Sequence, residues 1–137
     1  MSEPFRLTLP LRFAHCDPAG IAYYPRLLEL ADAAIEDWTA AVLGVPRRTM
    51  HLELGLGMPT VDLRADFAAT SRLGDPLDFA VAVERVGRSS VGLSVEVACA
   101  GERRFGVRYA QVLVRAATGH AEPWPAEWRA RLEEAAR

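Results

Sequence analysis

The chain has 137 residues, 50% of them hydrophobic, with a formal net charge of -2 at pH 7, so we expect residues 1–137 to form a single domain with a sizeable core. This charge argues against a nucleic-acid-binding protein that relies on attraction to phosphate, and all the basic residues are arginine, with no lysine. No apolar run approaches the ~20 residues of a membrane helix, and residues 1–6 lack the apolar core of a signal peptide, so a cytoplasmic protein is expected.

The first element is a predicted strand. Apolar residues alternate with other residues over positions 5–13, which indicates a strand with one buried face. Pro10 cannot donate a ladder hydrogen bond, so this strand lies at a sheet edge or bulges there. The sequence HCDPAGIAYYP follows at positions 15–25 and predicts a turn that leads into a helix.

One long amphipathic helix is predicted after this turn. Apolar residues recur at helical spacing over positions 27–42, and acidic residues fall mainly on the other faces. Pro25 suits the first turn of such a helix, and Gly44 suits its end. The segment at 47–58 is irregular and contains at most a short helical turn.

Four further strands and a terminal helix complete the predicted order. Alternating apolar residues place the strands at 61–69, 77–83, 91–99 and 105–115, and helical spacing places the last helix at 125–137. Short turns join the strands, one of them Gly74-Asp75-Pro76, so the strands must pair antiparallel. The alternation slips between Tyr109 and Val112, which indicates a bulge or burial on both faces. An α+β fold follows, with a sheet that can wrap one long helix.

The candidate chemistry lies in the turn at 15–25. Asp17 on a strand-to-helix turn faces the free N–H groups of the next helix, which is one way to place a nucleophile beside an oxyanion site. An aspartate at this position is also common as an N-cap or Asx-turn residue, so the local pattern leaves both roles open. Tyr23 and Tyr24 either fill the core at the helix entrance or line the site. His15 and Cys16 are not expected to pair with Asp17, because adjacent strand residues point to opposite faces.

Other catalytic and metal motifs are missing from the sequence. There is no Gly-x-Ser-x-Gly elbow of a serine α/β-hydrolase, and no Cys-x-x-Cys or His-rich cluster. Cys16 and Cys99 are expected to be free thiols, and no metal site is predicted.

The segment Asp17-Pro18-Ala19-Gly20-Ile21, followed by Tyr23-Tyr24 and Pro25, resembles the hotdog-fold acyl-CoA thioesterases of the 4-hydroxybenzoyl-CoA thioesterase type. The element order and the turn at 73–77 extend this resemblance over nearly the whole chain. It implies a hotdog fold, in which a five-stranded antiparallel sheet wraps around one long helix, here with a short C-terminal helix. It also implies a dimer, often a tetramer as a dimer of dimers, with active sites between subunits. The substrate would be an acyl-CoA, and no cofactor beyond this CoA is implied.

The same resemblance implies roles for particular residues. The carboxylate of Asp17 would attack the thioester or activate water, and the backbone N–H of Tyr24 would polarise its carbonyl. The residues implied to line the acyl and CoA path are Gly20, Tyr23, Pro59, Thr60, Val61, Arg88, Ser89 and Ser90. Pro25 stands where many relatives that cleave aliphatic acyl-CoA carry histidine, which favours an aromatic acyl group of the benzoyl or hydroxybenzoyl type. The alternatives are a short- or medium-chain aliphatic acyl-CoA thioesterase, a non-catalytic acyl-CoA-binding dimer, and an α+β lipid-binding cup.

Overall fold

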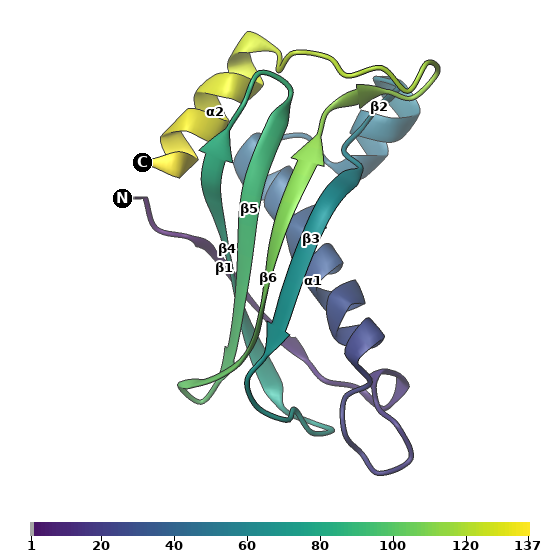
Figure 1. Ribbon diagram of the computed structural model, residues 1–137, viewed down its shortest axis with the longest axis vertical. Coiled ribbons are helices and arrows are strands. Elements are labelled where there is room, and N and C mark those ends of the chain that lie inside the picture. Colours follow the sequence, from purple (N-terminus) through teal and green to yellow (C-terminus); the bar gives the residue numbers. More distant parts are fainter. Residues whose placement is uncertain (1) are drawn as a thin grey trace.

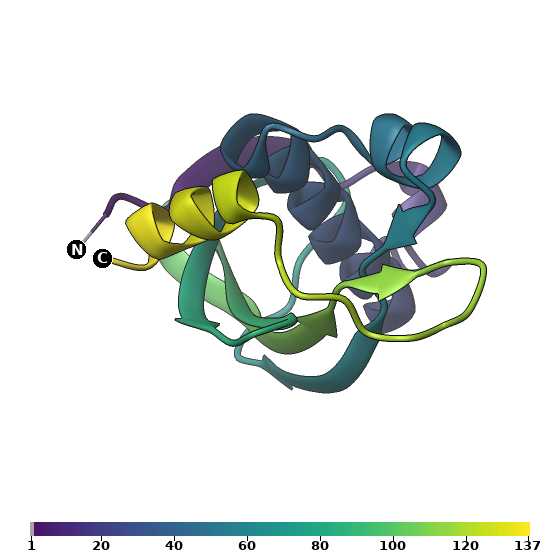
Figure 2. The same cartoon turned by 90° about the horizontal axis from the view of Figure 1, so that it is seen from above.

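A five-stranded antiparallel sheet curves around a long helix in the computed structural model, which describes residues 2–137 (Figure 1). The view along the long axis places α1 on the concave side of this sheet (Figure 2). The strands are β1 (Phe5–Pro10), β3 (Thr60–Phe67), β4 (Pro76–Val86), β5 (Ser90–Cys99) and β6 (Glu102–Val112), in the order β1-β4-β5-β6-β3. The helices are α1 (Tyr24–Trp38) and α2 (Ala126–Ala136). The predicted α+β architecture is confirmed.

The long helix forms where the apolar spacing predicts it. Its inward face buries Leu27, Ile35 and Trp38 against β1, β4 and β5, and each large apolar side chain contributes about 1.5–3 kcal/mol by leaving water. The helix continues as a π-helical turn at Thr39–Leu43 and ends at Gly44, whose φ of 80° is left-handed.

The first strand is shorter than predicted. It ends at Pro10, and the chain turns into a 3-10 helix at Phe13–His15, so Phe13 is 79% exposed instead of buried. Pro10 does lie on an edge strand, as its missing N–H requires.

The strand predicted at 61–69 is present as β3, but it is exposed in the single chain, although its alternation is typical of a strand with one buried face. Leu63 is 43% and Phe67 47% exposed, although both pair with inward residues of β6. The reason is the position of α1, which packs mainly against β1, β4 and β5 and meets β3 at Phe67 through Tyr24, so much of the concave side of β3 stays exposed.

The slip in the last strand comes from a buried polar residue. Side chains of β6 keep alternating through Val107, Tyr109 and Gln111, and Gln111 is only 4% exposed. The bulge lies in the neighbouring strand β3, at Val61, where the pairing with β6 shifts between Thr60 and Asp62. The predicted bulge is therefore found beside this stretch, but on the partner strand, and β6 itself bulges farther along, at Arg104, where its pairing with β5 shifts.

Smaller elements close the upper end of the molecule. The chain leaves the main sheet after β6 and forms β7 (Val114–Arg115), which pairs with β2 (Leu56–Gly57). A helical turn at Thr49–Glu53 confirms the one allowed in the irregular segment. The helix α2 packs against β4 and brings the two ends of the chain together, with the Ser2 hydroxyl donating to the Glu134 carbonyl at 2.6 Å (Figure 1). Within residues 2–137, no helix is long and apolar enough to cross a membrane.

Candidate active site

The carboxylate of Asp17 shapes the turn on which it lies. Its Oδ1 accepts hydrogen bonds from the N–H groups of Ala19 at 2.9 Å and Ile21 at 3.2 Å. The Asp17 carbonyl accepts from the N–H of Gly20 at 3.0 Å, and Gly20 has a φ of 76°, which a side chain would disfavour. The Oδ2 atom has no partner among residues 2–137, and Asp17 is exposed. The Asx-turn interpretation is therefore correct, and it leaves one carboxylate oxygen available.

The N–H of Tyr24 is the free donor at the start of α1. The N–H of Ala22 is donated to the Ser71 carbonyl, that of Tyr23 to the His15 carbonyl, and that of Arg26 to the Tyr23 carbonyl, each at 2.9 Å. Pro25 has no N–H. Within residues 2–137 the Tyr24 N–H has no acceptor, so it can donate to an oxygen that arrives from outside.

His15 and Cys16 do not pair with Asp17. His15 Nδ1 accepts from the N–H of Arg12 at 2.9 Å, and the Cys16 thiol donates to the Arg12 carbonyl at 3.4 Å. Both side chains therefore stabilise the turn before Asp17. The prediction that His15 and Cys16 do not pair with Asp17 is confirmed. The reason given for it, opposite faces of a strand, does not apply, because His15 lies in a 3-10 helix.

The connection from β3 to β4 holds the Asp17 turn from behind. Two hydrogen bonds join the two segments: the Ser71 carbonyl accepts from the Ala22 N–H, and the Gly20 carbonyl accepts from the Leu73 N–H. Asp75 in this connection accepts from Arg104 Nη1 at 2.6 Å, and the same nitrogen donates to a nearby carbonyl. The Arg104 side chain is 12% exposed, so the ion pair is largely shielded from water.

We expect the Arg104→Gln variant to lose about 1–3 kcal/mol of unfolding free energy at pH 7. The Arg72 N–H and the Arg104 guanidinium hold the pKa of Asp75 below its ordinary value of 3.8. This contribution is present above pH 3.8 and is lost as the pH falls through the lower native pKa, so the difference between wild type and variant should shrink in acid. Urea unfolding at several pH values measures it. Arg26→Gln, which removes the exposed pair with Glu29, is the control and should cost at most about 0.5 kcal/mol.

A pocket of about 320 Å³ adjoins this turn. Its walls come from the turn, the start of α1 and the end of β3, and its lining residues are Ile21, Ala22, Tyr24, Leu27, Phe67, Ala68, Ala69, Thr70 and Ser71. Tyr24 meets Phe67 edge to face, with ring centroids 6.1 Å apart. Tyr23 and Tyr24 are 55% and 58% exposed, so neither fills the core. The pocket is largely apolar, with aromatic walls.

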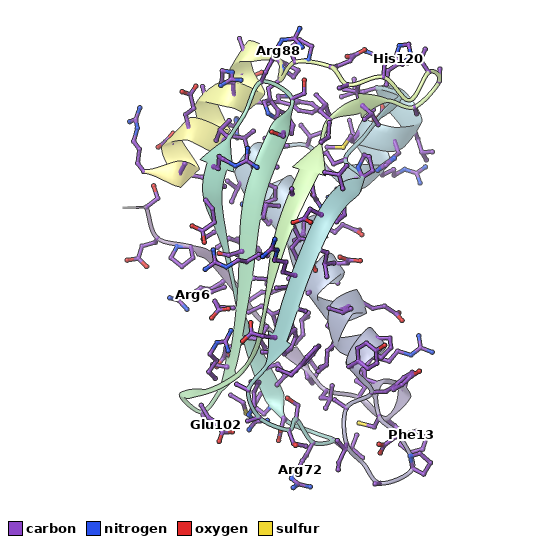
Figure 3. All side chains as sticks on the ribbon, in the orientation of Figure 1. Arg6, Phe13, Arg72, Arg88, Glu102 and His120 are labelled. Carbon is purple, nitrogen blue, oxygen red and sulfur yellow. The ribbon has the colours of Figure 1, made fainter. Side chains whose placement is uncertain are left out.

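The other predicted site residues lie at the opposite end of the sheet. Arg88 and Phe13, which precedes the Asp17 turn, mark the two ends (Figure 3). Pro59, Thr60 and Val61 and the group Arg88, Ser89 and Ser90 flank the end of β6 on its two sides. The seven steps of β3 from Phe67 to Thr60 correspond to about 23 Å. One chain therefore brings the two groups together, but places both far from Asp17.

A polar cluster beside α1 was not predicted. Tyr109 donates to Asp32 Oδ1 at 3.3 Å, and Gln111 Nε2 donates to Thr60 Oγ1 at 3.1 Å. Asp32, Thr60 and Gln111 border a hollow of about 200 Å³ together with Arg47. Burial raises the pKa of Asp32 and also that of Tyr109. Helical periodicity places Asp32 on an exposed face, and no pattern in one sequence pairs it with a strand tyrosine.

Two further observations concern metal binding and a second pocket. Within the described residues 2–137, no group of three or more histidine, cysteine or acidic side chains could hold a metal ion. A larger pocket, of about 480 Å³, lies between the N-terminal segment, α2 and β4, and contains none of the predicted site residues.

Comparison with known proteins gives matches over most of the chain. The model of the Thioesterase-like superfamily matches residues 11–132. A 4-hydroxybenzoyl-CoA thioesterase from Pseudomonas sp. (strain CBS-3) is 29% identical over 91 residues, which are 66% of this chain and 64% of that enzyme. The match thus spans less than two thirds of the length of that relative.

Solved structures share the fold. A thioesterase superfamily protein from Jannaschia sp. CCS1 is 25% identical with a TM-score of 0.90, over 98% of this chain and 94% of that one. A 1,4-dihydroxy-2-naphthoyl-CoA thioesterase from Synechocystis is 19% identical with a TM-score of 0.84, over 95% of this chain and 96% of that one. At 19% identity, this second likeness shows the fold alone.

Proposed function

Because the chain belongs to the Thioesterase-like superfamily, we propose that it is an acyl-CoA thioesterase, which hydrolyses a thioester to a free acid and CoA. The family predicted from the segment at 17–25 is confirmed, and with it the hotdog fold. The observation that carries the proposed activity is the turn itself, which leaves one oxygen of Asp17 and the N–H of Tyr24 without partners among residues 2–137.

Thioester hydrolysis makes modest demands on such a site. The leaving thiol has a pKa near 8.5, so it departs without a strong general acid. The free oxygen of Asp17 either attacks the carbonyl carbon and expels the CoA thiolate, which gives a mixed anhydride that water then hydrolyses, or takes a proton from a water that attacks the carbonyl and expels the thiolate directly. The Tyr24 N–H donates to the oxygen on which negative charge develops, and one such donor is typically worth ~10²- to 10³-fold in rate.

An aromatic acyl group is the substrate class that we propose. The apolar pocket beside the turn offers the edge-to-face pair of Tyr24 and Phe67, and aromatic rings favour this packing. Pro25, at the position where many relatives that cleave aliphatic acyl-CoA carry histidine, also favours an aromatic acyl group. The relative from Pseudomonas is named for a 4-hydroxybenzoyl thioester, which supports an acyl group of the benzoyl or hydroxybenzoyl type.

We further propose that the enzyme works as a homodimer, joined through β3. This edge strand exposes the apolar side chains of Leu63 and Phe67, and an exposed apolar edge is a site for pairing with another chain. Pairing with a second copy about a two-fold axis makes the two β3 strands antiparallel. The Thr60 end of one copy then lies beside the Phe67 end of the other, so Arg88 of one copy approaches Asp17 of its partner.

A tetramer, a cytoplasmic location and the absence of a cofactor remain predictions.

We expect the wild-type protein to release CoA from benzoyl-CoA and 4-hydroxybenzoyl-CoA with a kcat/KM at least tenfold above that for hexanoyl-CoA. A thiol-reactive dye follows the released CoA. A higher kcat/KM for hexanoyl-CoA would favour the aliphatic alternative. Release from none of the three thioesters, combined with tight binding of CoA, would instead favour a non-catalytic acyl-CoA-binding dimer.

A further inference from the structure

The connection between β4 and β5, residues 87–90, has every backbone carbonyl engaged. The carbonyl of Ser90 accepts from the Gly87 N–H at 2.8 Å and that of Ser89 from the Leu113 N–H at 2.7 Å. The remaining contacts come from the C-terminal part of the chain, which lies more than thirty residues away in sequence.

Two C-terminal residues form this contact. Arg129 Nη2 donates to the Gly87 carbonyl at 2.7 Å and approaches the Arg88 carbonyl at 3.4 Å. Trp124 donates its backbone N–H to the Arg88 carbonyl and its indole N–H to the Ser90 carbonyl, each at 3.1 Å. Trp124 is 5% exposed, so its two hydrogen bonds are shielded from water. A hydrogen bond is stronger in such a low-dielectric environment than in water.

A hairpin connection of this kind does not need such support. The bond from Gly87 to Ser90 closes it, and the pairs Val86–Val91 and Arg85–Gly92 continue the ladder below it. The additional contacts therefore fix the position of a loop that the strands would already form. The loop that they hold in place carries a single arginine, Arg88.

The side chain of Arg88 is left free by this arrangement. It is exposed at the upper end of the molecule, and among residues 2–137 it has no carboxylate partner (Figure 3). A guanidinium is suited to binding phosphate, and holding its backbone in place reduces the conformational freedom that binding must remove.

We propose that Trp124 and Arg129 are positioning residues, which hold the connection at 87–90 so that Arg88 meets a phosphate group of CoA. This inference rests on the proposed function for the identity of the ligand. In this role both residues act through the loop and not by their own contact with CoA. Their effect is therefore confined to ligands that carry the phosphates.

The test measures binding of CoA and of pantetheine, which lacks the phosphates, by titration calorimetry on the full chain. Arg129→Gln and Trp124→Phe are each expected to raise the Kd for CoA about 3- to 10-fold and to leave that for pantetheine unchanged. Arg129→Lys should recover part of the loss. Arg131→Gln, which alters another arginine of α2 outside this contact, is the matched control and should bind both ligands like the wild type.

Three outcomes would overturn the inference. If the variants bind CoA and pantetheine equally more weakly than the wild type, the two residues have a general structural role. If the variants bind CoA like the wild type, the two residues have no role in binding. If the wild type does not bind CoA, CoA is not the ligand of Arg88. Thioester hydrolysis is measured separately on the same variants, with benzoyl-CoA and benzoyl-pantetheine. A wild type that binds CoA but hydrolyses neither thioester contradicts the proposed activity and leaves the binding test of Trp124 and Arg129 intact.

Discussion

The Asp17→Asn variant is expected to lose at least ~10²-fold in kcat on every thioester that the wild type hydrolyses. Asparagine keeps a side-chain oxygen that can accept the N–H groups of Ala19 and Ile21, so the turn should retain its shape. A neutral amide oxygen is neither a nucleophile for the thioester nor a base for water. The substitution thus removes the chemistry and keeps the structure.

The assay is steady-state release of CoA, with circular dichroism and thermal unfolding to show that the fold is retained. Asp37→Asn is the control, because Asp37 is also an exposed acid but lies on α1 far from the turn. It should match the wild type in kcat and KM. An Asp17→Asn variant with unchanged kcat would overturn the assignment of Asp17 and leave the enzyme class standing. Incorporation of labelled oxygen from water into Asp17 in a single turnover would identify it as the nucleophile.

The fold was predictable because local patterns and global packing agree in this chain. The apolar spacing of α1 and the alternation in β4, β5 and β6 describe elements that each bury one face, and the structure buries those faces. Gly44 and Pro10 mark a helix end and an edge strand for reasons that lie in their own geometry. Such signals do not depend on neighbours that are distant in sequence.

The burial of the strand β3 does depend on neighbours that are distant in sequence. Its alternation is as regular as that of the buried strands, yet all of its residues are exposed in the single chain. Burial depends on what covers a strand, and α1 packs mainly against other strands. A pattern of apolar residues reports that a face will be covered, but does not tell whether the cover comes from the same chain or from a second copy.

The sequence predicts candidate site residues but not how one chain arranges them, and their roles stay predictions. Asp17 and Gly20 follow from turn chemistry and the family motif. The family resemblance already assigns the Tyr24 N–H as a donor, but the sequence does not show which acceptors the neighbouring N–H groups of Ala22 and Tyr23 use, the carbonyls of Ser71 and His15. The contact of Trp124 with the connection at 87–90 has no sequence signal, since indole-to-carbonyl bonds carry no spacing rule.

The separation of Asp17 from Arg88 in one chain leads to the second strong prediction. If β3 pairs with β3 of a second copy, each active site takes Asp17 from one chain and Arg88 from the other. Asp17→Asn lacks the attacking group, and Arg88→Gln lacks the phosphate contact, so each homodimer should be defective towards benzoyl-CoA at concentrations below KM. A heterodimer of the two variants has one site with both substitutions and one site with neither.

Heterodimers isolated with two different affinity tags should therefore recover about half of the wild-type kcat/KM per dimer. This recovery exceeds the mean of the two defective homodimers, which is what the heterodimer would show if each site took both residues from a single chain. A wild-type heterodimer with the same two tags controls for the tags, and sedimentation confirms the dimer. The experiment separates a shared site from a self-contained one without relying on the loss of activity in any single variant. Recovery would also explain why β3, the most exposed strand of the sheet, carries apolar side chains along its concave face: the same contact that covers Leu63 and Phe67 completes the site around Asp17.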